Sequence, residues 1–317
     1  MKNLFADKKK LIIPGIIVLI MIFLAVFPSF SAPYRIVWLS GILCCVILTI
    51  AWALFSGSTG YISLATAAFY GVGMYTAAIL GNDFPLLVVV LFGGLLSMVL
   101  AAIAGAITLR LRGIYFAIFT FGMVELIKYI LLWYEITFTG TRGRFVIVVD
   151  NQTIYYVMLG ILVLLLITTL ILRRSRWGLA LQSIGDNEEA AYHMGVNVTA
   201  LKVSIFSISA FFMGAVGAIM ATRVTYIDPY SAFDTILNFL PPLMAILGGI
   251  GTYYGPILGA FVFAAIEEWL ITSSIADYYR LIIGLALLAA ILYMPKGIVD
   301  VIEKAWRHFS GGKHALT

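Results

Sequence analysis

Charged residues are scarce in this sequence of 317 residues. Asp, Glu, Lys and Arg make up only 11% of it, whereas hydrophobic residues make up 62%. Soluble domains carry about 25% charged residues, so this composition excludes a soluble globular protein and indicates a chain that crosses a membrane several times. No polar stretch is long enough to form a separate soluble domain. We therefore expect residues 1–317 to form a single transmembrane domain.

Residues that bind metals or perform catalysis are also few. Cys44 and Cys45 are adjacent in an apolar run and cannot form a disulfide framework, and the three histidines are scattered. The sequence has no P-loop and no G-x-S-x-G motif. We therefore expect no enzymatic activity, no metal and no cofactor bound by this chain, so active transport would need another chain or an ion gradient as its energy source. Orientation in the bilayer explains the net charge of +5 better than binding to nucleic acid does.

Long apolar runs predict an all-α polytopic membrane protein, because about 20 apolar residues in a helix cross ~30 Å of hydrocarbon. Lys8–Lys10 and the small residues at Ser29–Ala32 flank the first run as they would in a signal peptide, but that run is long for one, and we assign it as a membrane span. We predict ten transmembrane helices, at 11–27, 34–55, 60–80, 85–109, 114–134, 152–172, 199–221, 235–250, 254–272 and 278–294.

The positions of Lys and Arg predict the orientation. With the N-terminus inside, fourteen of these residues fall in cytoplasmic segments and five fall outside, while Lys128 lies within a span. Cytoplasmic loops carry the excess of positive charge, so we expect both termini in the cytoplasm. The expected cytoplasmic segments include the N-terminus at 1–10, a loop at 173–198 and the tail at 295–317.

Several spans contain helix breakers. Gly57 and Gly60 lie among hydroxyl residues in FSGSTGYISL, where the third span should begin, and Pro241-Pro242 interrupt the eighth. Irregular backbone at membrane depth persists only where protein or a water-filled cavity surrounds it, so these breaks indicate a translocation path. Three glycines at four-residue spacing, Gly251, Gly255 and Gly259, predict a helix face for close packing.

Glu125 and Lys128 are charged residues within the fifth predicted span. They are three positions apart, so they share a helix face and can form an ion pair. Such charges are costly in hydrocarbon and usually face the interior of the bundle. Two interpretations stay open, a purely structural ion pair and a part of the path or gate. Glu267 and Glu268, in the ninth predicted span, lack a nearby cation in the sequence.

The loop at 173–198 is long enough to fold on its own. We predict a two-turn helix, Asn187 to Met194, about 12 Å long. Asp186 is the expected N-cap and Glu189 the third residue of a capping box, Glu188 adds a third early acidic residue, and Gly195 is the expected C-terminal stop. Such a short helix is marginal in water, and its small apolar face fits a groove on a partner. That face consists of Ala190, Ala191 and Met194.

The same helix carries a family resemblance. Glu189-Ala190-Ala191-x-x-x-Gly195 resembles the EAA-x-x-x-G signature of ABC importer permeases, in which it forms the coupling helix that docks onto the ATPase subunit. GYISLATAAFYGVGMYTAA (60–78) and LRLRGIYFAIFTFGMVELI (109–127) resemble branched-chain amino-acid permeases of the LivM/LivH class, M type. The resemblance covers roughly residues 35–300, and departs from the family at FTGTRGRF, which contains Arg142 and Arg144.

The resemblance implies a permease subunit of an ATP-driven importer in the bacterial inner membrane, with branched-chain amino acids as substrate. It also implies a homologous permease partner, two ABC ATPase subunits and an extracytoplasmic binding protein, all working at the lipid bilayer. Substrate would pass beside the third and fifth spans, where the expected path residues are Ser63, Thr66, Phe69, Tyr115, Thr120 and Glu125. Two alternatives remain: an ABC permease for urea or short amides, and a stand-alone ion-coupled transporter or channel in which Glu125 and Lys128 form a relay.

Overall fold

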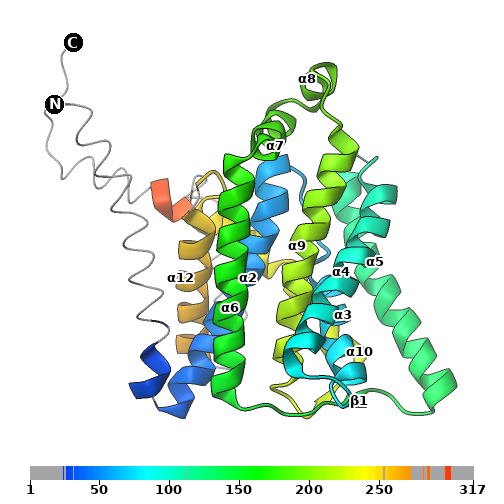
Figure 1. The fold of residues 1–317 in the computed structure, drawn as a ribbon, viewed down its shortest axis with the longest axis vertical. Coiled ribbons are helices and arrows are strands. Elements are labelled where there is room, and N and C mark those ends of the chain that lie inside the picture. Colours follow the sequence, from blue (N-terminus) through cyan, green and yellow to red (C-terminus); the bar gives the residue numbers. More distant parts are fainter. Residues whose placement is uncertain are drawn as a thin grey trace, which may run out of the picture.

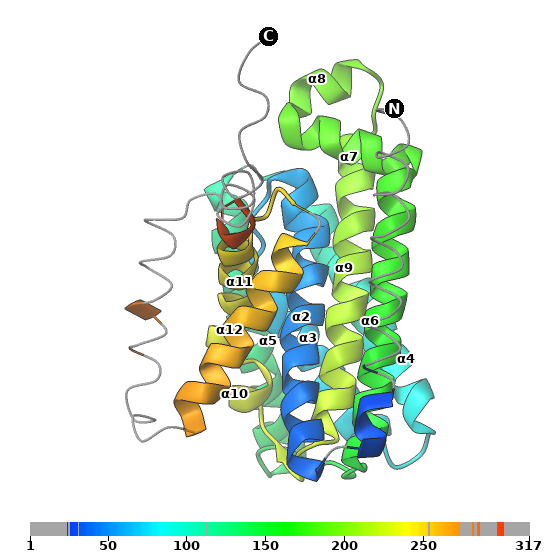
Figure 2. The same cartoon turned by 90° about the vertical axis from the view of Figure 1, so that its left-hand side faces the viewer.

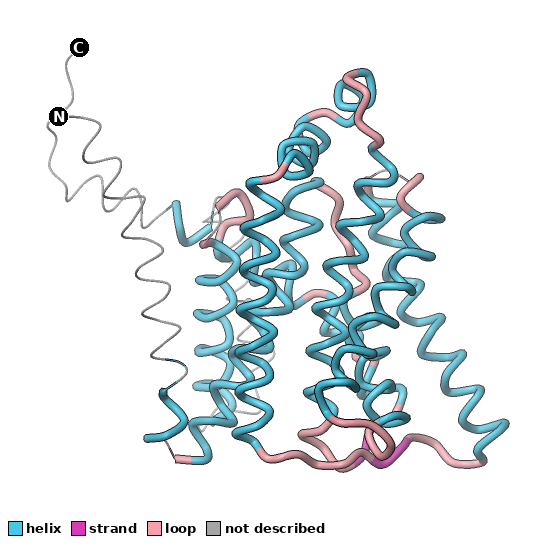
Figure 3. Tube along the Cα trace, viewed as in Figure 1, coloured by secondary structure: helices cyan, strands magenta, loops and turns pink. Residues whose placement is uncertain are grey.

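The computed structural model describes residues 32–272 apart from 112 and 253, together with residues 24, 26–30, 281, 284, 285 and 297–300. Within these residues the chain is a helical bundle with one two-stranded ribbon at one end (Figures 1 and 3). Seven helical segments of the described part are long and apolar enough to cross a membrane. They are α2 (Pro33–Thr59), α4 (Leu86–Thr108), α5 (Ile114–Tyr134) with η2 (Glu135–Thr139), α6 (Asn151–Arg174), α9 (Val198–Ala221), the broken segment Pro229–Gly248 and α12 (Gly255–Thr272).

Most predicted boundaries agree with the structure. The predicted spans 85–109, 114–134, 152–172, 199–221 and 254–272 match α4, α5, α6, α9 and α12 to within two residues. Side-chain caps define two of these starts, since Asp150 accepts from the Gln152 amide and Asn197 from the Ala200 amide. The predicted spans 11–27 and 278–294 and both termini lie almost entirely outside the described residues, so the count of ten and the cytoplasmic termini stay predictions.

The remaining elements are short. At the end with the ribbon, β1 (Arg144–Phe145) pairs antiparallel with β2 (Tyr226–Ile227), which is followed by α10 (Pro229–Ala232), η3 (Thr235–Asn238) and α11 (Leu240–Gly248). A turn of 3₁₀ helix, η1 (Phe27–Phe30), precedes α2. At the opposite end, α7 (Arg176–Asp186) and α8 (Glu188–His193) project beyond the membrane-spanning helices (Figure 1). The expected cytoplasmic loop at 173–198 and the turn between α4 and α5 therefore share one end of the bundle.

The centre of the bundle is α9, which packs along α3 (Thr66–Leu80) and α4. Small residues allow the backbones to approach closely. A Cβ atom on Gly73 would lie 1.9 Å from the Gly214 carbonyl oxygen, and one on Gly217 would lie 2.0 Å from the Tyr70 oxygen. Lipid tails are as apolar as the side chains they would replace, so helix association in a membrane depends on this kind of close packing.

A second group of helices contains α2, α11 and α12, with α6 packed against α2 (Figure 2). Gly255 and Gly259 face α11 as predicted, because a Cβ on Gly259 would lie 2.0 Å from the Met244 carbonyl oxygen. The prediction for the third glycine, Gly251, was wrong. It lies in the turn before α12, and a Cβ there would meet nothing within 4 Å; Gly248 of α11 completes the contact instead.

Both predicted breaks exist, but their positions differ from the prediction. The α2 helix continues to Thr59, so Gly57 lies inside it, and residues 60–65 form an irregular, non-helical segment before α3 begins at Thr66. Gly60 has φ +75°, which ends α2. In the eighth span, Pro241 and Pro242 lie in the first turn of α11 rather than interrupting it, because the first amides of a helix need no intrahelical partner. The break lies earlier, between α10 and α11.

Replacing Gly73 with Ala tests the close packing of α3 on α9. The added methyl group would overlap the backbone at Gly214, and we expect a loss of about 3 kcal/mol in the free energy of unfolding, measured by denaturant titration in detergent. Gly122→Ala in α5 is the matched control, because a Cβ there meets nothing within 4 Å. Equal stability of the two variants would show that α3 and α9 do not pack in this way.

Candidate functional site

The predicted cytoplasmic loop folds into two helices rather than one. Its N-terminal half forms α7, which ends at Asp186, so the expected cap of the short helix was wrong. Asn187 takes that place, with extended backbone, and its Oδ1 accepts from the amides of Glu189 and Ala190 at 3.1 Å each. The expected stop is confirmed, because Gly195 has φ +85° and its amide donates to the Tyr192 oxygen at 2.9 Å.

The faces of α8 differ in exposure. Ala191 is fully buried and packs with Ile184 of α7 and Val198 of α9 in a small apolar cluster. Ala190 is exposed, and the side chains of Tyr192 and Met194 are each 69% exposed. Ala191 therefore attaches α8 to the bundle, while its neighbours offer an apolar surface outward.

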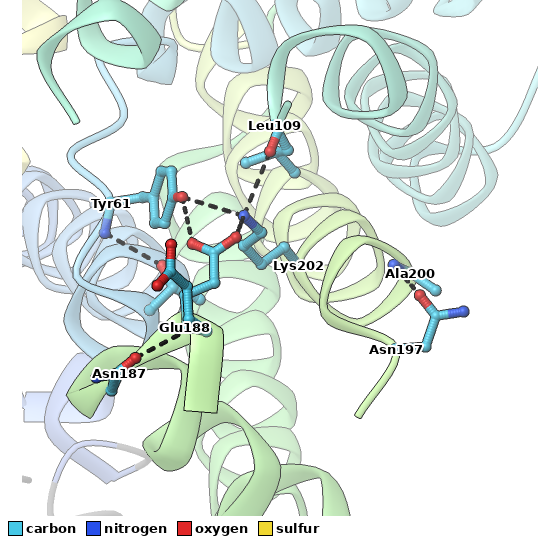
Figure 4. A network of polar contacts seen from close by, with 9 residues as sticks. Tyr61, Leu109, Asn187, Glu188, Asn197, Ala200 and Lys202 are labelled. Carbon is cyan, nitrogen blue, oxygen red and sulfur yellow. Dashed lines mark hydrogen bonds and ion pairs between the residues drawn. The ribbon is translucent and has the colours of Figure 1, made fainter. Parts of the chain in front are cut away.

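A buried ion network ties the start of α8 to the bundle (Figure 4). Lys202 of α9 donates to Glu188 Oε1 at 2.9 Å, to the Tyr61 hydroxyl at 3.2 Å and to the Leu109 carbonyl oxygen at 3.3 Å. The Tyr61 hydroxyl donates to Glu188 Oε2 at 2.5 Å. Lys202 is only 1% exposed, and a buried ammonium of this kind needs a carboxylate partner.

Sequence reasoning missed this network. It counted Lys202 as one of the cytoplasmic positive charges, whereas the structure buries it one turn into α9. A signal was present, because Lys202 is the only charged residue of a mostly apolar helix, and a lone charge in such a run usually has a partner. The sequence does not reveal that the partner is Glu188.

The second part of the candidate site is the break between α2 and α3. Side chains bond the freed backbone groups: the Leu64 amide donates to Thr120 Oγ1 at 3.0 Å, and the Ala67 amide donates to Asn238 Oδ1 at 2.8 Å. Both broken spans thus meet at the start of α3. The hydroxyl of Thr66 and the amide nitrogen of Asn238 are buried there without a hydrogen-bond partner in the described part of the chain.

The structure brings together only some of the expected path residues. Ser63, Thr66 and Thr120 are buried around this break. Phe69 packs in an aromatic cluster, with its ring centroid 5.3 Å from that of Phe206. Tyr115 is 69% exposed at the start of α5. The assignment of these residues to a path stays a prediction.

Glu125 and Lys128 form the predicted ion pair. Lys128 Nζ lies 2.6 Å from Glu125 Oε2, and the Thr235 hydroxyl donates to Glu125 Oε1 at 2.9 Å. The pair therefore links α5 to η3, the broken part of the eighth span. Glu268 accepts from the Tyr34 hydroxyl at 3.1 Å, a partner that lies far away in the sequence.

The opposite end of the bundle is held by ion pairs around the ribbon. Arg142 pairs with Asp228, and Arg144 Nε lies 3.8 Å from Glu135 Oε1. Burial raises the pKa of Asp228, but hydrogen bonds from Ser231 and Arg142 outweigh it and hold that pKa below its usual value. Arg142 and Arg144, in the loop whose sequence differs from the family pattern, therefore have structural partners. Among the described residues, no group of three or more His, Cys, Asp or Glu side chains could hold a metal ion.

Comparison with known proteins agrees with this architecture. The family described as "Branched-chain amino acid transport system / permease component" matches residues 35–291. The high-affinity branched-chain amino-acid transport permease LivM of Salmonella typhimurium is 25% identical over 300 residues, which is 84% of this chain and 70% of LivM. LivM of Escherichia coli is 25% identical over 81% of this chain and 68% of its own length.

Sugar permeases match a shorter segment. The ribose import permease RbsC of Haemophilus influenzae is 28% identical over 38% of this chain and 39% of its own. No solved structure matches the chain. The bundle of apolar helices defines a multi-pass membrane protein. The chain belongs to the branched-chain amino-acid transport permease family, as a LivM-type ABC importer permease of the inner membrane.

A double-mutant cycle on Glu125 and Lys128 tests whether the pair is structural. Lys128→Met leaves a carboxylate unpaired within the bundle, and we expect a loss of about 2–3 kcal/mol in the free energy of unfolding in detergent, since Glu125 is 29% exposed. The double variant Glu125→Gln/Lys128→Met removes both charges and should lose less than the single variant. Additive losses would contradict a paired role.

Proposed function

We propose that this chain forms the translocation path of an ATP-driven importer for branched-chain amino acids, and that α8 is its coupling helix for a separate ATPase subunit. The observation that carries the proposal is the construction of α8. It is a six-residue helix that projects from the bundle, with an exposed apolar surface at Ala190, Tyr192 and Met194. Its inner side is fixed by Ala191 and by the ion pair of Glu188.

These features suit a docking element better than a free loop. An isolated helix of this length is marginal in water, and here a cap, a glycine stop and a buried ion pair all fix it in one position. Rigid positioning of an otherwise exposed surface reduces the entropy lost when a partner binds. Glu189 at the start of the helix is exposed as well, so the whole EAA-x-x-x-G motif except Ala191 is accessible to a partner.

The substrate is inferred from the relatives. Both LivM proteins are named for branched-chain amino-acid transport, and they match more than twice as much of the chain as RbsC, which is named for ribose import. Urea or a short amide is the alternative substrate. We place the path beside the break at 60–65, where the donors of Thr66 and Asn238 are buried without a partner in the described residues, so that a polar group of the substrate would satisfy them once the break opens.

The proposal requires several partners. These are a homologous permease subunit in a heterodimer, two ABC ATPase subunits and an extracytoplasmic substrate-binding protein. Exposed apolar residues along α5, such as Ile118, Leu126 and Ile130, suit contact with lipid or with the second permease. The chain itself binds no cofactor in this proposal, because ATP is held by the ATPase subunits.

Uptake into proteoliposomes tests the function. The chain is reconstituted with its partner permease, the ATPase subunits and the binding protein, and uptake of labelled L-leucine is measured. We expect uptake to require ATP, and unlabelled isoleucine and valine to compete while urea does not. Competition by urea alone would favour the amide alternative. Uptake by this chain alone, driven by a proton or sodium gradient, would establish the stand-alone transporter and contradict the importer.

The variant Glu189→Ala/Gly195→Val tests α8 within the same system. A β-branched residue is strained at φ +85°, so the helix loses its stop as well as one acidic residue. We expect normal insertion into the membrane but a large loss of leucine uptake. Normal uptake in this variant would contradict the assignment of α8 as the coupling helix.

A further inference from the structure

The ion network of Lys202, Glu188 and Tyr61 joins four separate segments of the chain. Glu188 begins α8, Lys202 lies in the first turns of α9, Leu109 follows the end of α4, and Tyr61 lies in the irregular segment 60–65 (Figure 4). Two of these segments have roles in the proposed function, namely α8 as the docking helix and 60–65 as the break at the path. The network is the polar connection between them.

The energetics make this connection hard to open. An ammonium group has three N–H donors, and those of Lys202 are all used at 2.9–3.3 Å, with the Nζ atom also 4.3 Å from the Tyr61 ring centroid. Withdrawing Glu188 would leave a cation unpaired at a position only 1% exposed. A displacement of α8 is therefore more favourable when Lys202 and Tyr61 follow it.

The segment 60–65 can follow such a displacement. It lies between the end of α2 and the start of α3 and is not helical, and helical hydrogen bonds reach only its ends, where the Gly60 amide donates to the Ser56 carbonyl oxygen and the Ala65 carbonyl oxygen accepts from the Phe69 amide. The side chain of Ile62 in this segment is 52% exposed. The segment is nevertheless fixed at its other end, because Trp52 donates to the Ser63 carbonyl oxygen at 2.8 Å and Leu64 donates to Thr120. A movement of Tyr61 therefore displaces Ser63 and Leu64, whose hydrogen bonds to Trp52 and Thr120 hold the break.

Aromatic rings connect Tyr61, in the segment 60–65, to α9, the helix that carries Lys202. The ring of Tyr61 lies 5.7 Å from that of Phe116 in α5, which lies 5.9 Å from Phe206, one turn beyond Lys202 on α9. Phe55 at the end of α2 contacts both of these phenylalanines, at 5.8 and 4.8 Å. The cluster is buried, so Tyr61 has little freedom to move independently of α9.

We propose that Lys202 and Tyr61 are positioning residues for transport, which pass the displacement of α8 to the segment 60–65 at the translocation path. This inference rests on the proposed function, because it takes α8 as the element that the ATPase moves. Neither residue touches ATP or substrate in this scheme. Their removal should therefore change the amount of substrate moved per ATP hydrolysed, rather than the ability to hydrolyse ATP.

The test measures ATP hydrolysis and L-leucine uptake together, in the reconstituted complex with the binding protein. Tyr61→Phe keeps the ring and removes only the hydroxyl that bridges Lys202 and Glu188. A hydrogen bond to a charged group contributes about 1.5–3 kcal/mol, so we expect leucine uptake per ATP to fall at least about tenfold while hydrolysis continues. Tyr34→Phe is the matched control, because it removes a similar bond to Glu268 near the opposite end of the bundle and should leave the ratio unchanged.

Lys202→Met and Glu188→Gln complete the test as a cycle. If the two residues act as a pair, the double variant should be no more impaired in uptake per ATP than Lys202→Met alone. An unchanged ratio in Tyr61→Phe would overturn the inference even if Lys202→Met fails to fold. Co-purification of the ATPase with the wild type and with each variant distinguishes failure of the proposed function from failure of the positioning role. If the wild type binds no ATPase, the proposed function is contradicted. If the ATPase binds normally and the ratio of uptake to ATP hydrolysis is unchanged in the variants, only the positioning role is contradicted.

Discussion

Polar groups without partners are too costly in hydrocarbon, and this constraint explains where the chain departs from regular helix. At both breaks, side chains take over the bonds that the helix gives up, with Thr120 accepting from Leu64 and Asn238 accepting from Ala67. The charged residues follow the same rule, because Lys202 and Lys128 each have a carboxylate within 2.9 Å. Polar bonds therefore occur at the breaks and at the base of α8, which the proposed function uses, as well as around the ribbon at the other end of the bundle.

Close packing by small residues holds the helices together, because apolar burial does not drive helices to associate in a membrane. The contact of Gly73 with Gly214 fixes α3 on α9, and Gly248 with Gly259 fixes α11 on α12. These contacts hold the helical parts of the two broken spans in place. In the irregular segment at 60–65, Tyr61 and Ala65 pack in the core, whereas hydrogen bonds with Trp52 and Thr120 hold Ser63 and Leu64. Rigid helix pairs joined by an adaptable segment are what alternating access requires.

The sequence predicted the long helices well, because hydrophobic length is a local signal. It also predicted the short helix that ends at Gly195, and the Glu125–Lys128 pair, whose spacing is helical. It failed where the local structure depends on contacts with other elements. The N-cap of α8 is Asn187 rather than Asp186, because α7 extends through Asp186. Burial of Lys202 depends on Glu188 and Tyr61, which are 14 and 141 residues away, and no local pattern reveals this. The path residues stay predictions, with Tyr115 exposed on α5 and Phe69 in the core.

In the proposed mechanism, α8 and the segment 60–65 move together when ATP is bound. Paired spin labels test it directly in the reconstituted complex, at Tyr192 and Ile62, whose side chains are 69% and 52% exposed. A second pair joins Tyr192 to Leu164 of α6, which is also exposed. Distances are measured by pulsed electron resonance with and without ATP. The account predicts that the distance from 192 to 164 changes while that from 192 to 62 does not. A change in the distance from 192 to 62 as large as that from 192 to 164 would contradict it.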